Sequence, residues 1–129
     1  MLETDVRTYI LADAQVANLV GARMYPRMLP QTPTLPALVF QRIDTRRLHD
    51  LDGADGLPRA RLQITCWAAL PLDAATVAQA VRARLDGVTG TIGASTIGAS
   101  LCTAERDVTD AEAGRVGVAL DFLIHYQEN

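Results

Sequence analysis

Two segments of the chain alternate apolar and polar residues, which is the pattern of strands that bury one face of a sheet. They are residues 59–68 and 115–127. The apolar sets are Ala60, Leu62, Ile64 and Cys66 in the first and Val116, Val118, Leu120, Phe122, Ile124 and Tyr126 in the second. The sequence therefore predicts two long strands, each with a face directed to a core.

Each of these strands has a predicted partner. Residues 37–45 are rich in leucine, valine, phenylalanine and isoleucine, which favour strands. The stretch between this segment and residue 59 contains Asp52-Gly53 and Asp55-Gly56, which are strong turn signals, so the pair forms a long hairpin with a charged end. A strand from about residue 100 to 106 and a polar turn over 107–114 complete a second hairpin with the last strand.

Helical spacing of apolar residues appears in two places. Thr4 is a candidate cap for a first helix that runs to Val20 or breaks near Asp13. Pro71 and Asp73 open a second helix that ends at Gly87. Its apolar stripe is Val77, Val81 and Leu85.

Two further segments lack a clear element. Four prolines fall within residues 21–36, so neither a helix nor a central strand can run through them, although Met24 and Tyr25 suit a short extended piece. Residues 91–100 repeat Thr-Ile-Gly-Ala-Ser twice. Because five is odd, a regular strand would turn the two isoleucines to opposite faces. Either a turn separates the copies or the strand is weakly specified.

The predicted order is α-β-β-α-β-β over one domain, residues 1–129. This order indicates an α+β fold, with a mostly antiparallel sheet, two helices on one face and a long β-hairpin. Hydrophobic residues make up 49% of the chain, which is ordinary for a globular protein. We expect the outer sheet face to be available to a partner.

Charge and composition narrow the classes of partner. The net charge is −3, and all twelve positive side chains are arginine. An acidic protein is a poor general binder of nucleic acid, because that affinity rests on neutralising phosphates. The start of the chain is polar and acidic rather than a signal peptide, and no apolar run is long enough to span a membrane. We expect a soluble protein made in a cytoplasm.

Cys66 and Cys102 both lie in apolar, strand-like contexts. We interpret them as two buried thiols in a reducing compartment, although a disulfide between them is not decided by sequence.

No recognisable catalytic or metal-binding motif is present. His49 and His125 lie far apart and neither belongs to a cluster with ligand spacing. There is no Gly-x-Ser-x-Gly elbow and no phosphate-binding loop. The aspartate pairs lie in turns, where aspartate is expected anyway. We predict no enzymatic activity and no cofactor, with a small cytoplasmic enzyme as an alternative, since an active site can assemble from residues distant in sequence.

The first hairpin carries a concentration of arginine and aspartate. The candidate subunit or partner interface is Arg42, Arg46, Arg47, His49, Asp50, Asp52, Arg59 and Arg61. Arginine is favoured at interfaces, which supports this interpretation. One competing interpretation is a solvated hairpin of mixed charge. The other is a nucleic-acid-binding surface, whose positive electrostatic field the neighbouring aspartates would weaken.

Seven short motifs, taken in order, resemble one protein family over nearly the whole chain. They are LVGARMYP (19–26), LPALVFQ (35–41), LDG (51–53), ARLQITCWA (60–68), VRARLDG (81–87), ERD (105–107) and VGVALDF (116–122). The family is that of the tail-completion proteins of tailed bacteriophages, also described as tail-terminator or tail-to-head joining proteins. The repeat at 91–100 departs from the family pattern.

The resemblance implies a structural virion protein that forms a ring, typically a hexamer. Such a ring ends the head-proximal side of the tail tube and joins it to the head connector. The implied partners are further copies of the chain, the tail tube protein and the head–tail connector or stopper protein, with at most passive contact to DNA and none to a membrane. The implied location is the virion tail or neck of a phage, prophage or gene transfer agent, after assembly in the bacterial cytoplasm. A head-completion or connector protein is the alternative.

Overall fold

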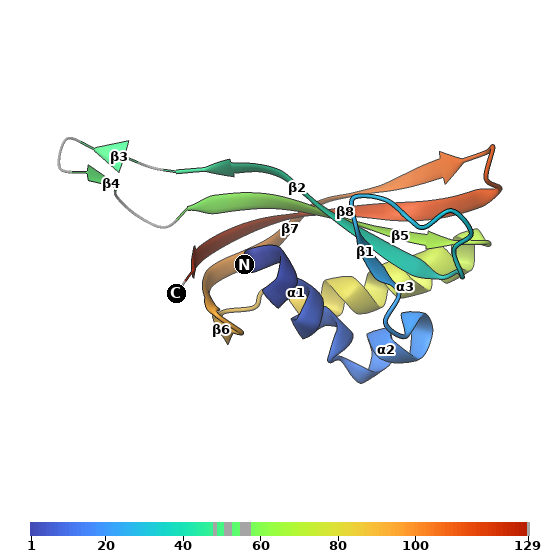
Figure 1. Cartoon of the computed structure of the whole chain (residues 1–129), viewed down its shortest axis with the longest axis horizontal. Helices are drawn as coiled ribbons and strands as arrows, with labels where there is room; N and C mark the ends of the chain where they lie inside the picture. Colours follow the sequence, from blue (N-terminus) through green and yellow to red (C-terminus); the bar gives the residue numbers. More distant parts are fainter. Residues whose placement is uncertain (48, 51–52, 55–57, 129) are drawn as a thin grey trace.

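The computed structural model describes residues 1–47, 49–50, 53–54 and 58–128 and confirms the α+β class. A long, twisted sheet has the strand order β1-β2-β5-β8-β7-β6, and the helices α1, α2 and α3 all lie against one of its faces (Figure 1). Every neighbouring pair in this sheet is antiparallel except β1 with β2. The opposite face of the sheet carries no helix in the described part of the chain.

The first hairpin follows the prediction closely. It consists of β2 (Ala37–Arg46) and β5 (Arg59–Ala68), with a bulge in β2 between Arg42 and Asp44. Beyond them β3 (His49–Asp50) and β4 (Gly53–Ala54) pair with each other. The inner face of β5 is buried as the alternation predicts, since its four apolar side chains are at most 1% exposed.

The first helical segment is two helices. α1 (Leu2–Leu11) and α2 (Ala14–Val20) are separated because Asp13 leaves the helical conformation and its carboxylate accepts a hydrogen bond from the Val16 amide at 3.1 Å. The predicted break near Asp13 is confirmed. The expectation of a Thr4 cap is wrong, because α1 already begins at Leu2.

The segment rich in proline contains β1 (Met24–Pro26), which pairs with the start of β2. It is an edge strand, which is the place in a sheet where proline is tolerated. α3 (Pro71–Leu85) begins at the predicted proline, and its apolar stripe of Val77, Val81 and Leu85 packs against the sheet as part of the core.

The repeat at 91–100 is a hairpin of β6 (Gly90–Ile92) with β7 (Ser95–Asp110). The turn falls inside the first copy, because Ile92 pairs with Ser95, and both isoleucines are buried. The Ser95 hydroxyl donates to Asp5 at 2.6 Å and fixes this hairpin on α1.

The second hairpin is longer than predicted. β7 continues to Asp110 and pairs with β8 (Arg115–Glu128), so the expectation of a polar turn over 107–114 is wrong for its first four residues. The turn occupies only residues 111–114. Backbone pairing overrides the polar composition here, because β8 offers partners for these residues and Arg115 pairs with the Asp110 carboxylate at 3.1 Å.

Candidate interaction surface

The predicted arginines of the first hairpin lie mainly on the outer sheet face. Arg59 and Arg61 alternate with buried residues of β5, so they face away from the helices. Arg46 is the direct cross-strand partner of Arg59, and Asp44 is that of Arg61. The like charges of Arg46 and Arg59 therefore lie opposite each other, and such a cross-strand pair is destabilising in the monomer.

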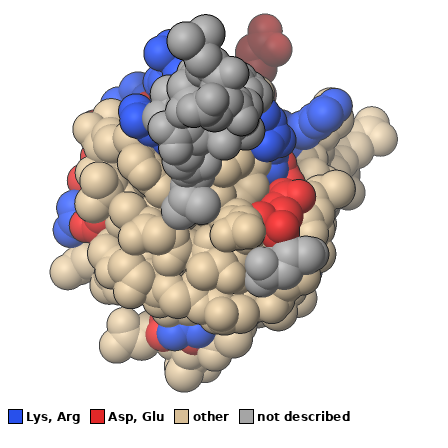
Figure 2. Space-filling model, turned by 90° about the vertical axis from the view of Figure 1, so that its left-hand side faces the viewer, with Lys and Arg blue, Asp and Glu red and all other residues tan. Residues whose placement is uncertain are grey.

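One carboxylate, Asp44, faces these arginines among the described residues. It lies 4.0 Å from Arg46 and 3.7 Å from Arg61, whose side chains are 77% and 50% exposed. Exposed pairs of this kind contribute little to stability, typically about 0–1 kcal/mol. We define Arg46, Arg47, Arg59 and Arg61 as the hairpin-base arginines; blue side chains stand at this end of the molecule in Figure 2. They remain largely available to an acidic partner.

The register of the sheet adds His125 to this surface, although the sequence did not predict that it lies beside the arginines. His125 in β8 is the cross-strand partner of Arg59, so Arg46, Arg59 and His125 form a row across three strands. His125 is half-buried, as predicted for a strand-end residue. The row arises from pairing between segments about 65 residues apart in sequence, and alternation within one strand carries no signal for it.

The other predicted residues have different positions. The backbones of His49 and Asp50 lie in β3, while Asp52 lies outside the described residues. Arg47 directly follows β2 and is exposed. The interface role of all eight residues stays a prediction.

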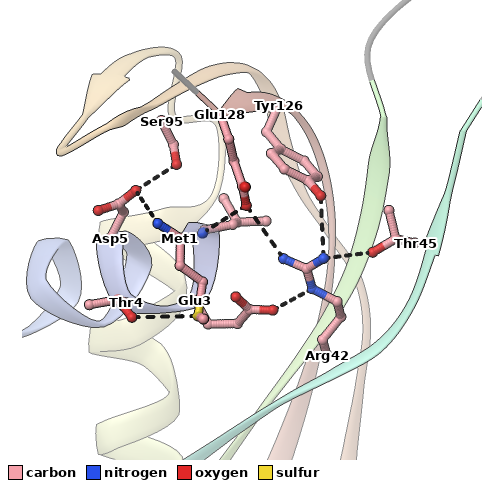
Figure 3. A network of polar contacts seen from close by, with 10 residues as sticks. Met1, Glu3, Thr4, Asp5, Arg42, Thr45, Ser95, Tyr126 and Glu128 are labelled. Carbon is pink, nitrogen blue, oxygen red and sulfur yellow. Dashed lines mark hydrogen bonds and ion pairs between the residues drawn. The ribbon is translucent and has the colours of Figure 1, made fainter. Parts of the chain in front are cut away.

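Arg42 points to the helix face and is bound within the chain (Figure 3). It forms an ion pair with Glu3 of α1, donates to Thr45 Oγ1 at 3.0 Å and to the Tyr126 hydroxyl at 3.3 Å, and lies 3.9 Å from Glu128. Only 27% of the side chain is exposed. Arg42 thus joins the first helix and the last strand to β2.

We expect Arg42→Met to lower the free energy of unfolding by about 1–3 kcal/mol, because the partly buried Glu3 carboxylate loses its partner. Urea denaturation measures the change. Arg46→Met is the matched control and should stay within about 0.5 kcal/mol, since that side chain is mostly exposed. Equal stabilities of the two variants would contradict a structural role for Arg42.

A hollow of about 580 Å³ lies beside this network. Met1, Thr4, Pro26, Gln41 and Arg42 are among its lining residues, so it opens along the edge of β2 where β1 ends. Its walls combine apolar atoms with the charges of Arg27, Arg42, Glu3 and Glu128.

The cysteines are not a reactive pair. Both are free, Cys66 is buried as predicted, and Cys102 is partly exposed, so the expectation of a buried thiol is wrong there. Burial raises the pKa of the Cys66 thiol far above its ordinary value. Burial and the nearby Asp86 and Glu105 carboxylates also raise the pKa of Cys102, so both thiols stay protonated at neutral pH.

Two other kinds of site are absent from the described residues. Across residues 1–47, 49–50, 53–54 and 58–128, no three or more His, Cys, Asp or Glu side chains gather in a way that could hold a metal ion. Over the same ranges no helix combines the length and apolarity needed to cross a membrane.

The fold is shared with a virion component. A chain in the solved structure of the virion of a native gene transfer agent particle superimposes with a TM-score of 0.81. That likeness covers 99% of this chain and 95% of the other, at 22% sequence identity. No curated protein sequence matches significantly.

The family model of tail completion protein gp17 matches residues 4–127. The chain therefore belongs to the tail completion protein gp17 family, as the motif order in the sequence predicts. It is a structural protein of a phage or phage-like tail.

Proposed function

We propose that this protein forms a hexameric ring at the head-proximal end of the tail tube, where it terminates the tail and joins it to the head connector. The observation that carries the proposal is the family match, which spans both long hairpins and all three helices. The likeness to a chain of a gene transfer agent virion supports the same setting. The role is mechanical and involves binding rather than catalysis.

The shape of the chain suits such a role. One sheet face is covered by helices and the other carries no helix in the described part of the chain, while the first hairpin projects from one end (Figure 1). A ring needs a head-to-tail interface between identical copies and two further surfaces for the structures above and below. We assign the hairpin-base arginines, together with His49, Asp50 and Asp52, to one of these contacts.

The proposed partners follow from this position. They are further copies of the chain, the tail tube protein and the head–tail connector or stopper protein. DNA passing through the ring would meet it only passively, since the chain is acidic overall. Assembly would take place in the bacterial host cytoplasm, and the mature location would be the neck of the particle.

Electron microscopy of the purified protein, alone and mixed with tail tubes, tests the proposal. We expect rings, or a cap on one end of each tube. A protein that stays monomeric and never binds tubes would contradict it. Binding to portal complexes in place of tubes would support a head-completion protein instead.

A further inference from the structure

Two stretches of the main sheet are unpaired edges. β1 covers residues 38–40 of β2, and on that side of β2 no strand of the described residues pairs with residues 41–46. β6 covers only the first three residues of β7. Next to these, the loop after α3 binds β7, since Gly87 donates to the Ser100 carbonyl at 2.7 Å and Cys102 donates to Asp86 at 2.9 Å. Residues 105–110 are then open in the described structure.

The direction of the free backbone groups in β7 follows from these contacts. Ser100 and Cys102 use groups that point away from β8, and such groups recur on every second residue. The pairing of β8 with β5 is regular throughout, so the backbone groups of β8 residues point alternately to β5 and to β7 along its whole length. The β8 partner of each β7 residue therefore shows which β7 residues point these groups outward beyond the bulge. This pairing assigns outward N–H and C=O groups to Glu105, Asp107 and Thr109. An open edge of this kind is a template for another strand.

The edge of β2 is open in the same way. Outward groups of Leu38 and Phe40 bond to Arg23 and Arg27, and the alternation assigns the next ones to Arg42 and Thr45. The hollow of about 580 Å³ lies alongside, so there is space where an added strand would continue the line of β1.

The topology makes these edges compatible between copies. The four long strands β2, β5, β8 and β7 alternate in direction, so β7 of one copy would meet β2 of the next as an antiparallel pair when copies repeat head to tail. An even number of alternating strands is what a continuous antiparallel sheet requires.

The offset along the strands between the two open stretches also suits a closed ring. The ladders place residues 41–46 of β2 level with residues 99–104 of β7, so the open stretch 105–110 lies about six residues further along, or about 20 Å. Four strands span about 19 Å of sheet width. The resulting strand tilt is about 45°, close to the roughly 35–45° of closed barrels.

Charge selects head-to-tail pairing over pairing of like edges. Residues 105–110 contain three carboxylates and one arginine, whereas residues 41–47 contain three arginines and one aspartate. Two copies of the β7 edge would repel each other, while β7 against β2 brings opposite charges together. Pairing of unlike edges generates rings or filaments rather than dimers.

We infer that residues 105–110 of β7 dock on the open edge of β2, residues 41–46, in a second copy of this chain, so that the sheet continues from subunit to subunit. The inference rests on the proposed ring and specifies the surface that closes it. The added strand lies along the hollow beside Pro26 and Gln41. Glu105 and Asp107 of the neighbouring β7 are on the helix side of the sheet, which is the side of Arg42, whereas the hairpin-base arginines are on the outer side.

Thr109→Pro tests this contact, because proline removes an outward N–H without changing charge and leaves the bonds to β8 in place. We expect at least about a tenfold fall in assembled rings, counted by electron microscopy and sedimentation, with an unchanged monomer circular dichroism spectrum. Thr109→Ala keeps the N–H and is the matched control that should assemble as the unchanged protein does.

Hydrogen exchange provides a second readout on the unmodified protein. Ring assembly should slow amide exchange at Glu105, Asp107 and Thr109 and at Arg42 and Thr45. If rings form but these amides exchange as in the monomer, the inference is overturned even where Thr109→Pro fails to fold. If rings form without tail tubes and these amides become protected only after tubes are added, the inference is also overturned, since the edges would then bind the tube protein.

The outcomes separate the inference from the function. Rings of the unchanged protein that form equally well with Thr109→Pro would overturn the edge contact and leave the ring intact. The absence of rings from the unchanged protein, with and without tail tubes, would contradict both.

Discussion

Replacing Leu120 by alanine is expected to lower the free energy of unfolding by about 2–5 kcal/mol, the range for a leucine removed from a packed core. Leu120 lies in the middle of β8, is 0% exposed and belongs to the core between the sheet and the helices. Neighbouring strands on both sides hold its backbone, so the cavity cannot collapse easily. Urea denaturation of the monomer measures the change. Leu62→Ala in the adjacent strand should behave alike.

Leu123→Ala is the matched control in the same strand. Its side chain lies on the open sheet face and is only half-buried, so we expect a loss below about 1 kcal/mol. If the two leucine variants lost stability equally, the helices would not cover the face that the structure assigns to the core.

Reversing the charge of Arg46 and Arg47 together, as Arg46→Glu with Arg47→Glu, should leave the fold intact and strongly reduce assembly. Arg46 is mostly exposed and contributes little to the monomer. We expect a loss of at least about tenfold in tube capping, because an attractive surface would become repulsive to an acidic partner. Counting capped tubes by electron microscopy, with unfolding of the monomer measured in parallel, gives both quantities.

Lysine at both positions is the control, since it keeps the charge but loses the planar geometry of arginine. Capping by the lysine variant, lost progressively as salt is added, would identify charge as the main contribution. Full capping by the glutamate variant would show that this end of the hairpin is merely solvated.

The sequence predicts the fold best where one strand face is buried. The bounds of β5 and the burial of its alternate residues agree with the pattern, because a one-residue slip would expose the whole apolar set. The sequence predicts the end of β7 less well. Residues 107–110 are polar and resemble a turn, and only their pairing with β8 makes them a strand.

The candidate surface also has one part that the sequence predicts and one part that arises only in the folded molecule. Arg46, Arg59 and Arg61 lie together because the hairpin brings them together, and a hairpin can be predicted from local signals. Arg42 has the same strand parity as Leu38 and Phe40, so its direction toward the helices could have been found. Its carboxylate partners could not, because Glu3 and Glu128 come from opposite ends of the chain and meet only in the folded molecule.

The same network holds the two ends of the chain together. The Leu2 amide donates to the Glu128 carboxylate at 3.1 Å, and α1 and β8 share Arg42. A short linker could therefore join the first residue to the last, and new ends could be opened in the turn at residues 111–114 without altering the order of strands in the sheet. Such a circular permutant would have no chain end beside the β2 edge, whereas an affinity tag attached next to Met1 or Glu128 would begin beside that edge.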